Sequence, residues 1–592
     1  MAVLDAIFDV VIIGGGTSGL ALAARLSEDP SLQVAVLEAG EDKTTDPRVS
    51  TPAMWITTLK TEIDWDFKTI PQSTLGGTQL DSPAGRALGG TSSINSFLVS
   101  PTSKTHIDAW SRLGNPGWDW SSFSTAVKKA FSTVQLKTPD LDEPENAWLK
   151  VWSDTIGTLG YPASNDPFSG EVRGAVISPE SINPTTGKRC SSADAYLEPA
   201  RQRPNLTVIT GATVSKILFN KSVSGSDDAV AEGVQYTIVE NGETKTAQAV
   251  ARKEVVVAAG ALSSPRLLEL SGIGNAALLQ GLGIQVVVDN PYVGENLQNH
   301  VLVGTVFEVQ EDSDLPSRDP FNRQDPAVLG PAVAAYAKGQ GPLATSGTNA
   351  YAQLPFPEIE TVVGREAADR LIQDAVSEGV KSSEGSTITK PAFAAAHESF
   401  VRSVLTSPTD APVVNIAVNT FVPYDAADPT FRPPGRWFSV TSILAHPLSR
   451  GSVHITDASP SGGAALDPRF LSHPLDAEVL ARSLRYTEER IVKAEPLAKH
   501  LRPREANRFV DAEAAKEYIR RTVKGGNHWV GSCSMMPREI GGVVDARLRV
   551  YGTKNLRVVD ASVVPLVSRS NTMAVVYGVA ELGAQIIKDD LS

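Results

Sequence analysis

The sequence predicts an α/β protein whose first lobe is a doubly wound parallel sheet, followed by at least one further lobe. Two observations predict the first lobe. An apolar strand pattern at 8–13 leads through a glycine-rich turn into a helical pattern, and a second strand pattern follows at 32–37. The length of 592 residues predicts the further lobe, because it exceeds what one hydrophobic core supports.

The first strand, turn and helix have the pattern of a dinucleotide-binding unit. "FDVVII" at 8–13 is a short, β-branched run typical of a strand buried on both faces, and Gly14, Gly16 and Gly19 then fit G-x-G-x-x-G. Gly14 permits the tight turn, Gly16 lets the backbone approach a pyrophosphate, and Gly19 allows close helix–strand packing. Glu38, at the end of the second strand, can accept hydrogen bonds from both ribose hydroxyls. This unit predicts a dinucleotide but does not decide between FAD and NAD.

The bulk composition excludes several classes of function. A net charge of −13 argues against nucleic acid or an anionic membrane as the main partner, because phosphate would be repelled. Two cysteines exclude a disulfide framework, although a single bridge stays open, and the eight histidines show no zinc-type spacing, so no metal is expected. No apolar run is long enough to span a bilayer.

The N-terminal "MAVLDAIFDVVIIGGG" has no basic region and no cleavage site, so the expected location is cytoplasmic, or secreted if a leader has been trimmed. The oligomeric state is left open.

Two further glycine-rich stretches lie downstream. "GRALGGTSSINSFL" at 85–98 has few bulky side chains, which lets something flat and large come close to the backbone. "GALSSPRLLELSGIG" at 260–274 follows the buried strand pattern "EVVVAAG" and has the pattern of a strand–turn–helix unit.

These two stretches resemble the two signatures of the glucose–methanol–choline (GMC) family of FAD-dependent oxidoreductases, of fungal type. The second signature fits throughout, whereas the first departs at Val99 and Thr102. "YVGENLQNH" at 292–300, with Asn299 where Asp is common, resembles a third family segment. The C-terminal "GGVVDARLRVYGTKNLRVVDASVVP" resembles a fourth, so the likeness runs from residue 8 to about residue 587.

The resemblance implies a noncontiguous layout. Residues 1–45, 85–110, 200–310 and 540–592 would form an FAD-binding, Rossmann-like domain. Residues 46–84, 111–199 and 311–539 would form a substrate-binding domain on a mostly antiparallel sheet with helices.

The resemblance also implies which residues contact FAD. They are Gly14, Gly16, Thr17 and Ser18 at the pyrophosphate, Glu38 at the ribose, Gly90, Asn95, Ser96 and Phe97 along the flavin ring, Val214 near the adenine, and Asp560, Ala561 and the segment up to Met573 at the pyrophosphate and pyrimidine end. Some family members bond the flavin to a histidine at the position of Ile94. Because isoleucine has no nucleophilic nitrogen, FAD is expected to be noncovalent.

"NHWVGSC" at 527–533 resembles the family segment whose histidine faces the flavin N5, which makes His528 the expected general base. The second active-site position of the family falls on Asn571, whose amide would orient the alcohol oxygen. A core histidine and a helix N-cap are the alternatives for these two residues. Trp529 is expected to line the substrate pocket, with a core position as the alternative, and Met535 and Met536 are expected to serve packing.

The resemblance therefore implies oxidation of an alcohol group, with hydride passing to flavin N5 and electrons then passing to O2 or a quinone-type acceptor. The alternative is a non-redox lyase or cyclase that retains FAD on the same scaffold. Sugar, aryl, aliphatic and secondary-metabolite alcohols all stay open, as does the choice between oxidase and dehydrogenase.

Overall fold

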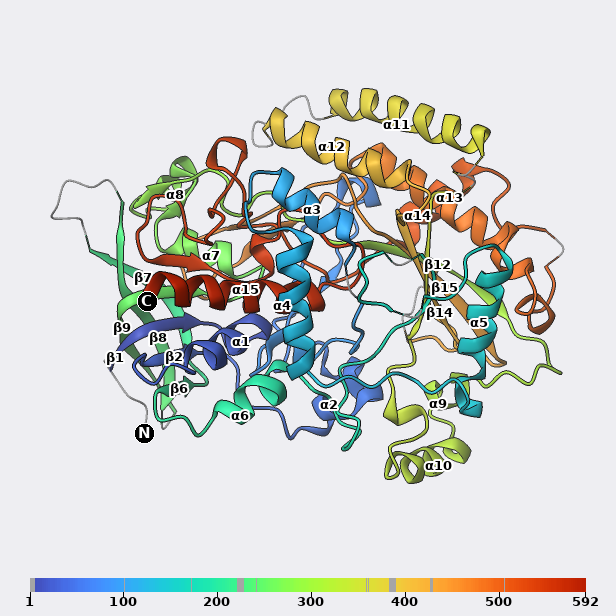
Figure 1. Ribbon diagram of the computed structural model, residues 1–592, viewed down its shortest axis with the longest axis horizontal. Coiled ribbons are helices and arrows are strands. Elements are labelled where there is room, and N and C mark those ends of the chain that lie inside the picture. The colour runs from blue at the N-terminus through green and yellow to red at the C-terminus, as the bar shows by residue number, and fades with distance from the viewer. Residues whose placement is uncertain are drawn as a thin grey trace.

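A computed structural model of the chain describes residues 6–592, except residues 101, 165, 172, 221–227, 241, 358, 360, 383–389, 426–429 and 505. Its two large sheets divide the chain into the two kinds of lobe that the sequence predicts (Figure 1).

The first sheet is built on five parallel strands in the order β6-β2-β1-β9-β19. They are β6 (Leu206–Ile209), β2 (Val34–Leu37), β1 (Ala6–Ile13), β9 (Glu243–Val257) and β19 (Leu556–Val558). Residues 8–13 of β1 are all buried, as their unalternating apolar pattern predicts. Helix α1 (Thr17–Leu26) follows the glycine turn, so the doubly wound fold class is confirmed.

Strand β9 joins this sheet to an antiparallel extension. Its first residues pair with β8 (Val230–Glu240), which in turn pairs with β7 (Thr213–Asn220), and its last residues lie between β1 and β19. One fifteen-residue strand therefore belongs to both parts of the sheet.

The second sheet is antiparallel throughout, in the order β18-β12-β15-β14-β13-β5. Its strands are β18 (Lys524–Gly525), β12 (Val301–Glu308), β15 (Trp437–Leu444), β14 (Val413–Val418), β13 (Ala350–Leu354) and β5 (Gly174–Ile177). Helix α5 (Ala147–Thr158) packs Trp148 and Trp152 against one face near β5 and β13, and α13 (Pro474–Glu489) lies against β12, β14 and β15.

Strand β12 marks where the chain enters the second sheet. Residues 301–308 form the strand between β15 and β18 in the antiparallel sheet. The chain crosses to the second sheet directly after His300, where the family-like segment ends and an apolar strand begins. Helix α4 (Trp120–Thr133) packs on α15 (Met573–Leu591).

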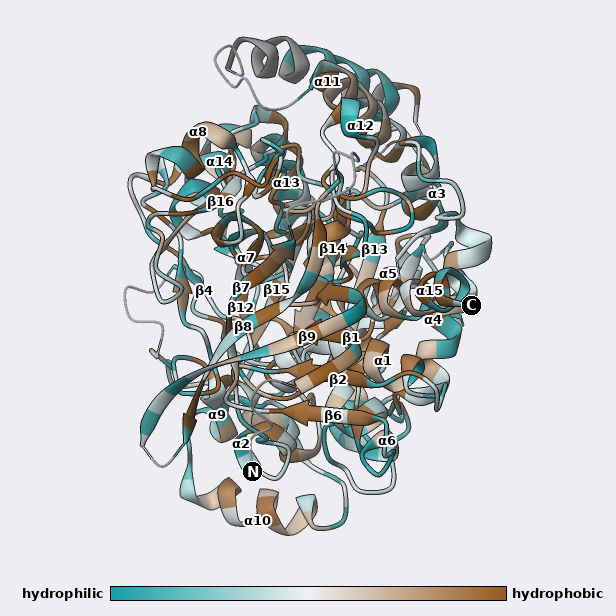
Figure 2. Cartoon of the chain, turned by 90° about the vertical axis from the view of Figure 1, so that its left-hand side faces the viewer, coloured by the Kyte–Doolittle hydropathy of each residue, from teal (hydrophilic) through white to brown (hydrophobic). Residues whose placement is uncertain are grey.

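Helices α1, α4 and α15 lie side by side near the parallel sheet, while α11 (Val362–Ser382) and α12 (Pro391–Leu405) run along the outer edge of the molecule (Figure 1). Apolar residues colour the strands of the parallel sheet, whereas polar residues colour much of α11 (Figure 2).

The remaining helices are α2 (Pro47–Ser50), α3 (Lys104–Arg112), α6 (Glu198–Ala200), α7 (Ser264–Leu270), α8 (Ala276–Gly281), α9 (Asp319–Asn322), α10 (Pro326–Tyr336) and α14 (Ala512–Thr522). The remaining strands are β3 (Phe67–Lys68), β4 (Asp81–Ser82), β10 (Ile273–Gly274), β11 (Val288–Asp289), β16 (Ser452–Ile455) and β17 (Ala464–Asp467).

Cys190 and Cys533 are both buried and unbridged, so the single disulfide that the sequence left open does not form. Among the helices of the described residues, none has the length and apolar character that a membrane span requires.

The end of α15 is fixed to the parallel sheet by a cluster of charged side chains. Asp590 accepts hydrogen bonds from Arg549 Nη2 at 2.7 Å and Arg557 Nη2 at 2.8 Å, and it also pairs with Arg547. Arg557, on β19, has no exposed side-chain surface and reaches Glu254 on β9 at 2.8 Å. Burial alone would raise the pKa of Asp590, but the hydrogen bonds from Arg547 and Arg557 outweigh it and lower the pKa to about 2.

We predict that Asp590→Asn lowers the stability of the protein at neutral pH by about 1 kcal/mol, a value that allows for solvent screening. Because the folded-state pKa lies below that of an unfolded aspartate, the contribution is present above about pH 4 and is lost as pH falls toward 2. Thermal unfolding at pH 7 and pH 3 should show a smaller difference between wild type and variant at pH 3. The exposed neighbour variant Asp589→Asn is the matched control, and an equal loss in both variants would contradict the prediction.

Candidate active site

The glycine turn after β1 brings backbone segments close together. Gly14 has φ +106°, and a Cβ on Gly19 would lie 1.9 Å from the carbonyl oxygen of Gly14. Gly90 packs so closely on Gly16 that a Cβ on Gly90 would lie 2.7 Å from the Gly16 Cα. Gly16 is the N-cap of α1 and offers no side-chain oxygen to the first-turn amides. The N–H groups at Thr17 and Ser18 are therefore available to an external acceptor such as a phosphate.

Glu38 lies beside this turn and is 6% exposed. Its Oε2 accepts from the Gly15 N–H at 2.7 Å and its Oε1 from the Gly40 N–H at 2.8 Å. Burial raises the pKa of Glu38 to about 7, although these two backbone hydrogen bonds oppose the shift. Each carboxylate oxygen still has a second lone pair with which to accept a hydroxyl.

The segment 89–97 lies against the glycine turn. The Gly89 N–H donates to Gly15 O at 2.8 Å, which joins the two glycine-rich stretches that the sequence singled out. Asn95 and Ser96 are half-buried, and Phe97 is fully buried with φ +69°, a strained value for a bulky residue. Asn95 Nδ2 contacts Met573 Sδ at 3.3 Å, which links this segment to the start of α15.

Arg189 holds the same segment in place. It is 3% exposed, and its guanidinium donates to Ser92 O at 3.0 Å and to Asn95 Oδ1 and O, both at 2.8 Å. Its Cζ lies 3.6 Å from the centre of the Phe97 ring. Burial lowers the pKa of Arg189 to about 9. Sequence analysis did not single out this residue, because it lies outside every motif.

Asp560 joins the C-terminal segment to the turn after β9. Its carboxylate accepts from the Gly260 N–H at 2.9 Å, from Ser264 Oγ at 2.5 Å and from the Ser562 N–H at 2.7 Å. Ala561 is half-buried, and its carbonyl oxygen is 3.4 Å from the Gly531 nitrogen. Val214 is half-buried on β7, opposite Tyr236.

His528 and Asn571, the two predicted catalytic residues, are in direct contact. Asn571 Nδ2 lies 3.1 Å from His528 Nε2, and Tyr351 donates its hydroxyl to Asn571 Oδ1 at 2.6 Å. The Asn571 oxygen therefore faces Tyr351 and its NH2 group faces the imidazole. The N-cap alternative for Asn571 is wrong, because the N-cap of α15 is Thr572.

A second histidine completes the site. His300 Nδ1 lies 2.7 Å from His528 Nδ1, and His300 Nε2 lies 2.7 Å from Ser568 O and 3.0 Å from Ala445 O. A carbonyl oxygen only accepts, so we assign the proton of His300 to Nε2. Its Nδ1 is then an acceptor, which requires the proton of His528 on Nδ1. His528 Nε2 then accepts the hydrogen bond from Asn571 Nδ2.

Both imidazoles are neutral at pH 7. Burial lowers the pKa of His300 to about 4, against the opposing effect of its two carbonyl partners. Burial lowers the pKa of His528 well below 6.5, and the neighbouring His300 lowers it further. His528 is also fixed through its backbone N–H, which donates to Asn299 Oδ1 at 2.8 Å.

The loop that carries Asn571 is held by three histidines on successive carbonyl groups. His106 Nε2 lies 2.8 Å from Leu566 O, His446 Nδ1 lies 3.1 Å from Val567 O, and His300 bonds Ser568 O. Gln298 Oε1 accepts from the Val567 N–H at 2.8 Å. Arg569 pairs with the buried Asp410 at 3.1 Å. This loop therefore has little freedom to move Asn571.

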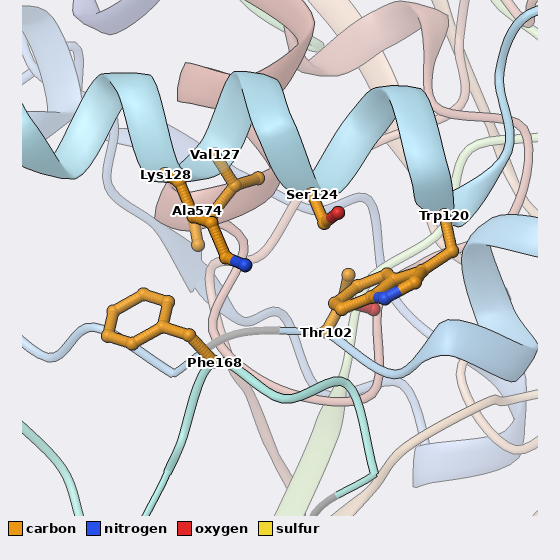
Figure 3. Close-up of a pocket in the computed structure, with 7 residues that line it drawn as sticks. All are labelled: Thr102, Trp120, Ser124, Val127, Lys128, Phe168 and Ala574. Atoms are coloured by element: carbon orange, nitrogen blue, oxygen red, sulfur yellow. The ribbon is translucent and has the colours of Figure 1, made fainter.

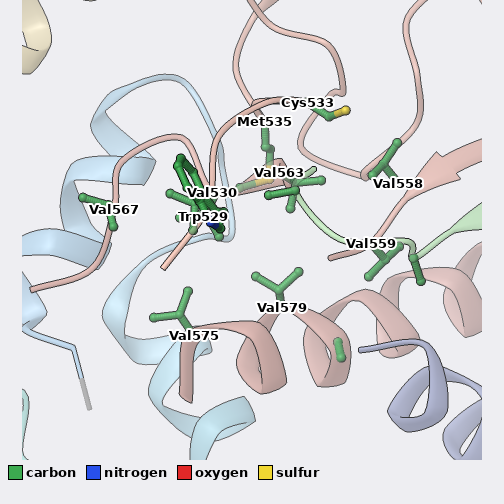
Figure 4. Close-up of a cluster of buried hydrophobic side chains, with 14 of the residues drawn as sticks. Trp529, Val530, Cys533, Met535, Val558, Val559, Val563, Val567, Val575 and Val579 are labelled. Atoms are coloured by element: carbon green, nitrogen blue, oxygen red, sulfur yellow. The ribbon is translucent and has the colours of Figure 1, made fainter. Parts of the chain in front are cut away.

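Trp529 lies in the main hydrophobic core, 7% exposed, with its ring 6.1 Å from that of Phe470. Figure 4 shows it beside Val530 and above α15, in the same cluster as Met535. This geometry favours the core alternative for Trp529 over a pocket wall. Met535 and Met536 are buried as expected for packing residues.

A separate small pocket lies beside α4, lined by Thr102, Trp120, Ser124, Val127, Lys128, Phe168 and Ala574 (Figure 3). His528 and Asn571 do not line it, so we assign it no role in the chemistry. Over the described residues, no group of three or more His, Cys, Asp or Glu side chains is arranged to hold a metal ion.

Sequence reasoning missed three residues of this site: His300, Tyr351 and Arg189. Of these, only His300 lies in a stretch that the sequence analysis had noted, the segment 292–300.

Several known proteins are similar to this chain over nearly its whole length. Two family models described as GMC oxidoreductase match residues 8–302 and 447–580. The dehydrogenase mpl7 of Monascus purpureus is 33% identical, over 98% of this chain and 96% of the relative. An FAD-dependent oxidoreductase from Chaetomium thermophilum superposes with a TM-score of 0.84 at 26% identity, over 99% of both chains. A fungal aryl-alcohol oxidase superposes with a TM-score of 0.83 at 25% identity, also over 99% of both chains.

The family and its FAD-dependent structural neighbours identify FAD as the cofactor. The chain belongs to the GMC oxidoreductase family and is an FAD-dependent oxidoreductase.

Proposed function

We propose that this protein oxidises an alcohol to the corresponding carbonyl compound, with His528 as the general base and Asn571 as the group that orients the alcohol oxygen. The observation that carries the proposal is the hydrogen bond from Asn571 Nδ2 to His528 Nε2 at 3.1 Å, which a substrate hydroxyl group could replace. An acceptor nitrogen beside an amide donor suits a hydroxyl group, since the hydroxyl can donate to one and accept from the other.

The residues beside the glycine turn fit FAD. The uncapped first turn of α1 at Gly16, Thr17 and Ser18 would bind the pyrophosphate, and Glu38 would accept the ribose hydroxyls. The flavin ring would lie along Gly90, Asn95, Ser96 and Phe97, which the Asn95–Met573 contact joins to the segment that bears Asn571. Val214, Asp560, Ala561 and Met573 would complete the cofactor site.

Bound FAD supplies the two-electron acceptor for the hydride that leaves the alcohol carbon, and O2 or a quinone-type compound reoxidises it. His528 Nε2 would take the hydroxyl proton, and Asn571 Nδ2 would donate a hydrogen bond to the alcohol oxygen. The imidazolium formed on His528 keeps its Nδ1–H on His300 Nδ1, so that proton transfer changes no other hydrogen bond of the pair. Asn571 keeps its NH2 group toward the base because His528 Nε2 is an acceptor, and the Asn571 oxygen accepts from the Tyr351 hydroxyl.

The attachment of FAD is proposed to be noncovalent. Ile94 is 3% exposed and packs with Val49, Ile63 and Ala87, so the position used for attachment in some family members is an apolar contact in this chain.

We predict that His528→Ala retains FAD but slows flavin reduction by alcohol roughly 10²–10⁴-fold, because a positioned base contributes about that much. Anaerobic stopped-flow bleaching of the flavin absorption measures the rate, and the visible spectrum reports retention of the cofactor. His500→Ala is a matched control, since His500 bonds Ser313 and contacts neither His528 nor Asn571. Near-normal reduction in His528→Ala would remove this residue from the mechanism. Product formation by the wild type with the flavin still oxidised would favour a lyase or cyclase instead.

We predict that His300→Gln moves the acid limb of flavin reduction to higher pH. The base must be unprotonated to accept a proton, so the rate falls below the pKa of His528. Burial lowers that pKa first, and His300 lowers it further once His300 is itself protonated, below about pH 4, so an uncharged glutamine in its place raises the pKa of His528. Reduction rates from pH 4 to pH 9 test this expectation.

His446→Gln is the matched control for this experiment. His446 bonds the neighbouring carbonyl, Val567 O, but is not hydrogen-bonded to His528. A shift of equal size in both variants would mean that His300 acts only by holding the loop.

A further inference from the structure

Arg189 is a buried cation without a carboxylate partner. Its side chain donates four hydrogen bonds, and all of them end on neutral oxygens: the backbone carbonyls of Val49, Ser92 and Asn95, and the amide Oδ1 of Asn95. Among the described residues, no ion pair joins Arg189 to an Asp or Glu side chain. Burial of a charge without an opposite charge is costly, so we expect a negative charge close to this guanidinium in the working enzyme.

Two carboxylates lie close enough to influence Arg189, but both are bonded to other groups. Asp194 accepts from the Ser191 N–H at 2.8 Å and from the Ser191 hydroxyl at 2.6 Å. Glu180 accepts from two groups of the turn at 345–346, at 2.8 and 2.6 Å. Burial lowers the pKa of Arg189 to about 9, against the opposing effect of these nearby acids, so the guanidinium is still charged at pH 7.

The contacts of Arg189 lie at one end of the segment 89–97, the end that is proposed to follow the flavin ring. The guanidinium bonds Asn95 twice, and its Cζ lies 3.6 Å from the centre of the Phe97 ring. The other end of the segment, at 89–90, packs on the glycine turn where the pyrophosphate is proposed to bind. The unpaired charge therefore lies at the flavin end of the segment and not at the phosphate end.

Arg189 also determines which side of the Asn95 amide is occupied. Asn95 Oδ1 accepts from Arg189 Nη1 at 2.8 Å and from the Phe97 N–H at 3.1 Å. The NH2 group lies on the other side of the amide, where Met573 Sδ is a weak acceptor at 3.3 Å. Because the guanidinium polarises this amide, its NH2 group becomes a stronger donor toward a negative charge.

We infer that the positive charge of Arg189 stabilises the flavin in its reduced form and thereby raises its reduction potential. This inference rests on the proposed alcohol oxidation and on the proposed position of the flavin ring. The hydride that leaves the alcohol carbon brings two electrons and one proton to the ring, which gains one negative charge, while the hydroxyl proton goes to His528. A buried cation attracts that charge more strongly than it would in water. Arg189 acts through its charge and through Asn95, so it is a positioning residue.

The test is the midpoint potential of the FAD-loaded protein at pH 7, measured during slow anaerobic reduction by dithionite beside a reference dye. In Arg189→Gln the equilibrium constant for reduction should fall about tenfold or more, and tenfold corresponds to about 30 mV for a two-electron couple. Arg189→Lys keeps the charge and should stay close to the wild-type potential. Arg450→Gln is the matched control, because Arg450 also bonds backbone carbonyls, those of Pro447 and Ser449, but none in the segment 89–97.

An unchanged potential in Arg189→Gln, or an equal fall in Arg189→Gln and Arg189→Lys, would overturn the inference. Weaker FAD binding with an unchanged potential would also overturn it, because the charge would then act on the pyrophosphate. If Arg189→Gln does not fold, Asp194→Asn tests the same electrostatic field with the opposite sign. It removes a nearby negative charge and should raise the potential, and an unchanged potential would again overturn the inference.

The same preparations separate this inference from the proposed function. Bleaching of the wild-type flavin by an alcohol supports alcohol oxidation whatever the potentials of the variants are. If no alcohol bleaches the wild-type flavin although dithionite does, the proposed function fails, while the measured potentials still decide whether Arg189 stabilises the reduced flavin.

Discussion

The site depends on one hydrogen bond between two imidazole rings, His300 Nδ1 to His528 Nδ1. Only one proton can lie between these two nitrogens, so the protonation of one ring dictates that of the other. Backbone carbonyls at Ala445 and Ser568 fix His300, His300 fixes His528, and the acceptor Nε2 of His528 fixes the Asn571 amide. The arrangement of the donors and acceptors thus follows from carbonyl groups, which have no alternative protonation state.

The surrounding structure restricts movement of these groups. Successive carbonyls of the loop 566–568 bond three different histidines, and the buried Arg569–Asp410 pair follows. On the cofactor side, the close packing of Gly16 and Gly90 leaves no room for a Cβ, and Arg189 bonds the backbone of 92–95. Both sides thus contain buried polar groups whose hydrogen bonds join segments that are distant in sequence, which restricts their movement.

Sequence reasoning succeeded where the determinants are local. The strand–turn–helix unit at 6–26 follows from apolar runs and glycine spacing within a short window, and the structure confirms it. The pairing of His528 with Asn571 came from a family resemblance, and the structure brings these two residues into contact. Tyr351 and Arg189 were missed because their contacts, to Asn571 and Asn95, join segments that are distant in sequence. The sequence could not decide whether Trp529 lies in the core or lines the substrate pocket, since both positions have the same apolar pattern. Nothing in the composition marks where the chain crosses from one sheet to the other, so the domain boundaries came only from the family resemblance and stay predictions.

The lobe of the parallel sheet contains segments from the beginning and from the end of the chain. Strand β1 emerges from the ribosome early, whereas β19 and α15 emerge hundreds of residues later. Until then the nascent chain lacks β19, which pairs with β9, and α15, which packs on α1. It also lacks the charged cluster around Asp590 that joins α15 to the sheet. N-terminal segments of large proteins usually fold first during translation. The glycine turn after β1 and the first strands must therefore stay soluble before the rest of their lobe has been synthesised. The complete FAD-binding site forms only when the last turns of α15 have packed on the sheet.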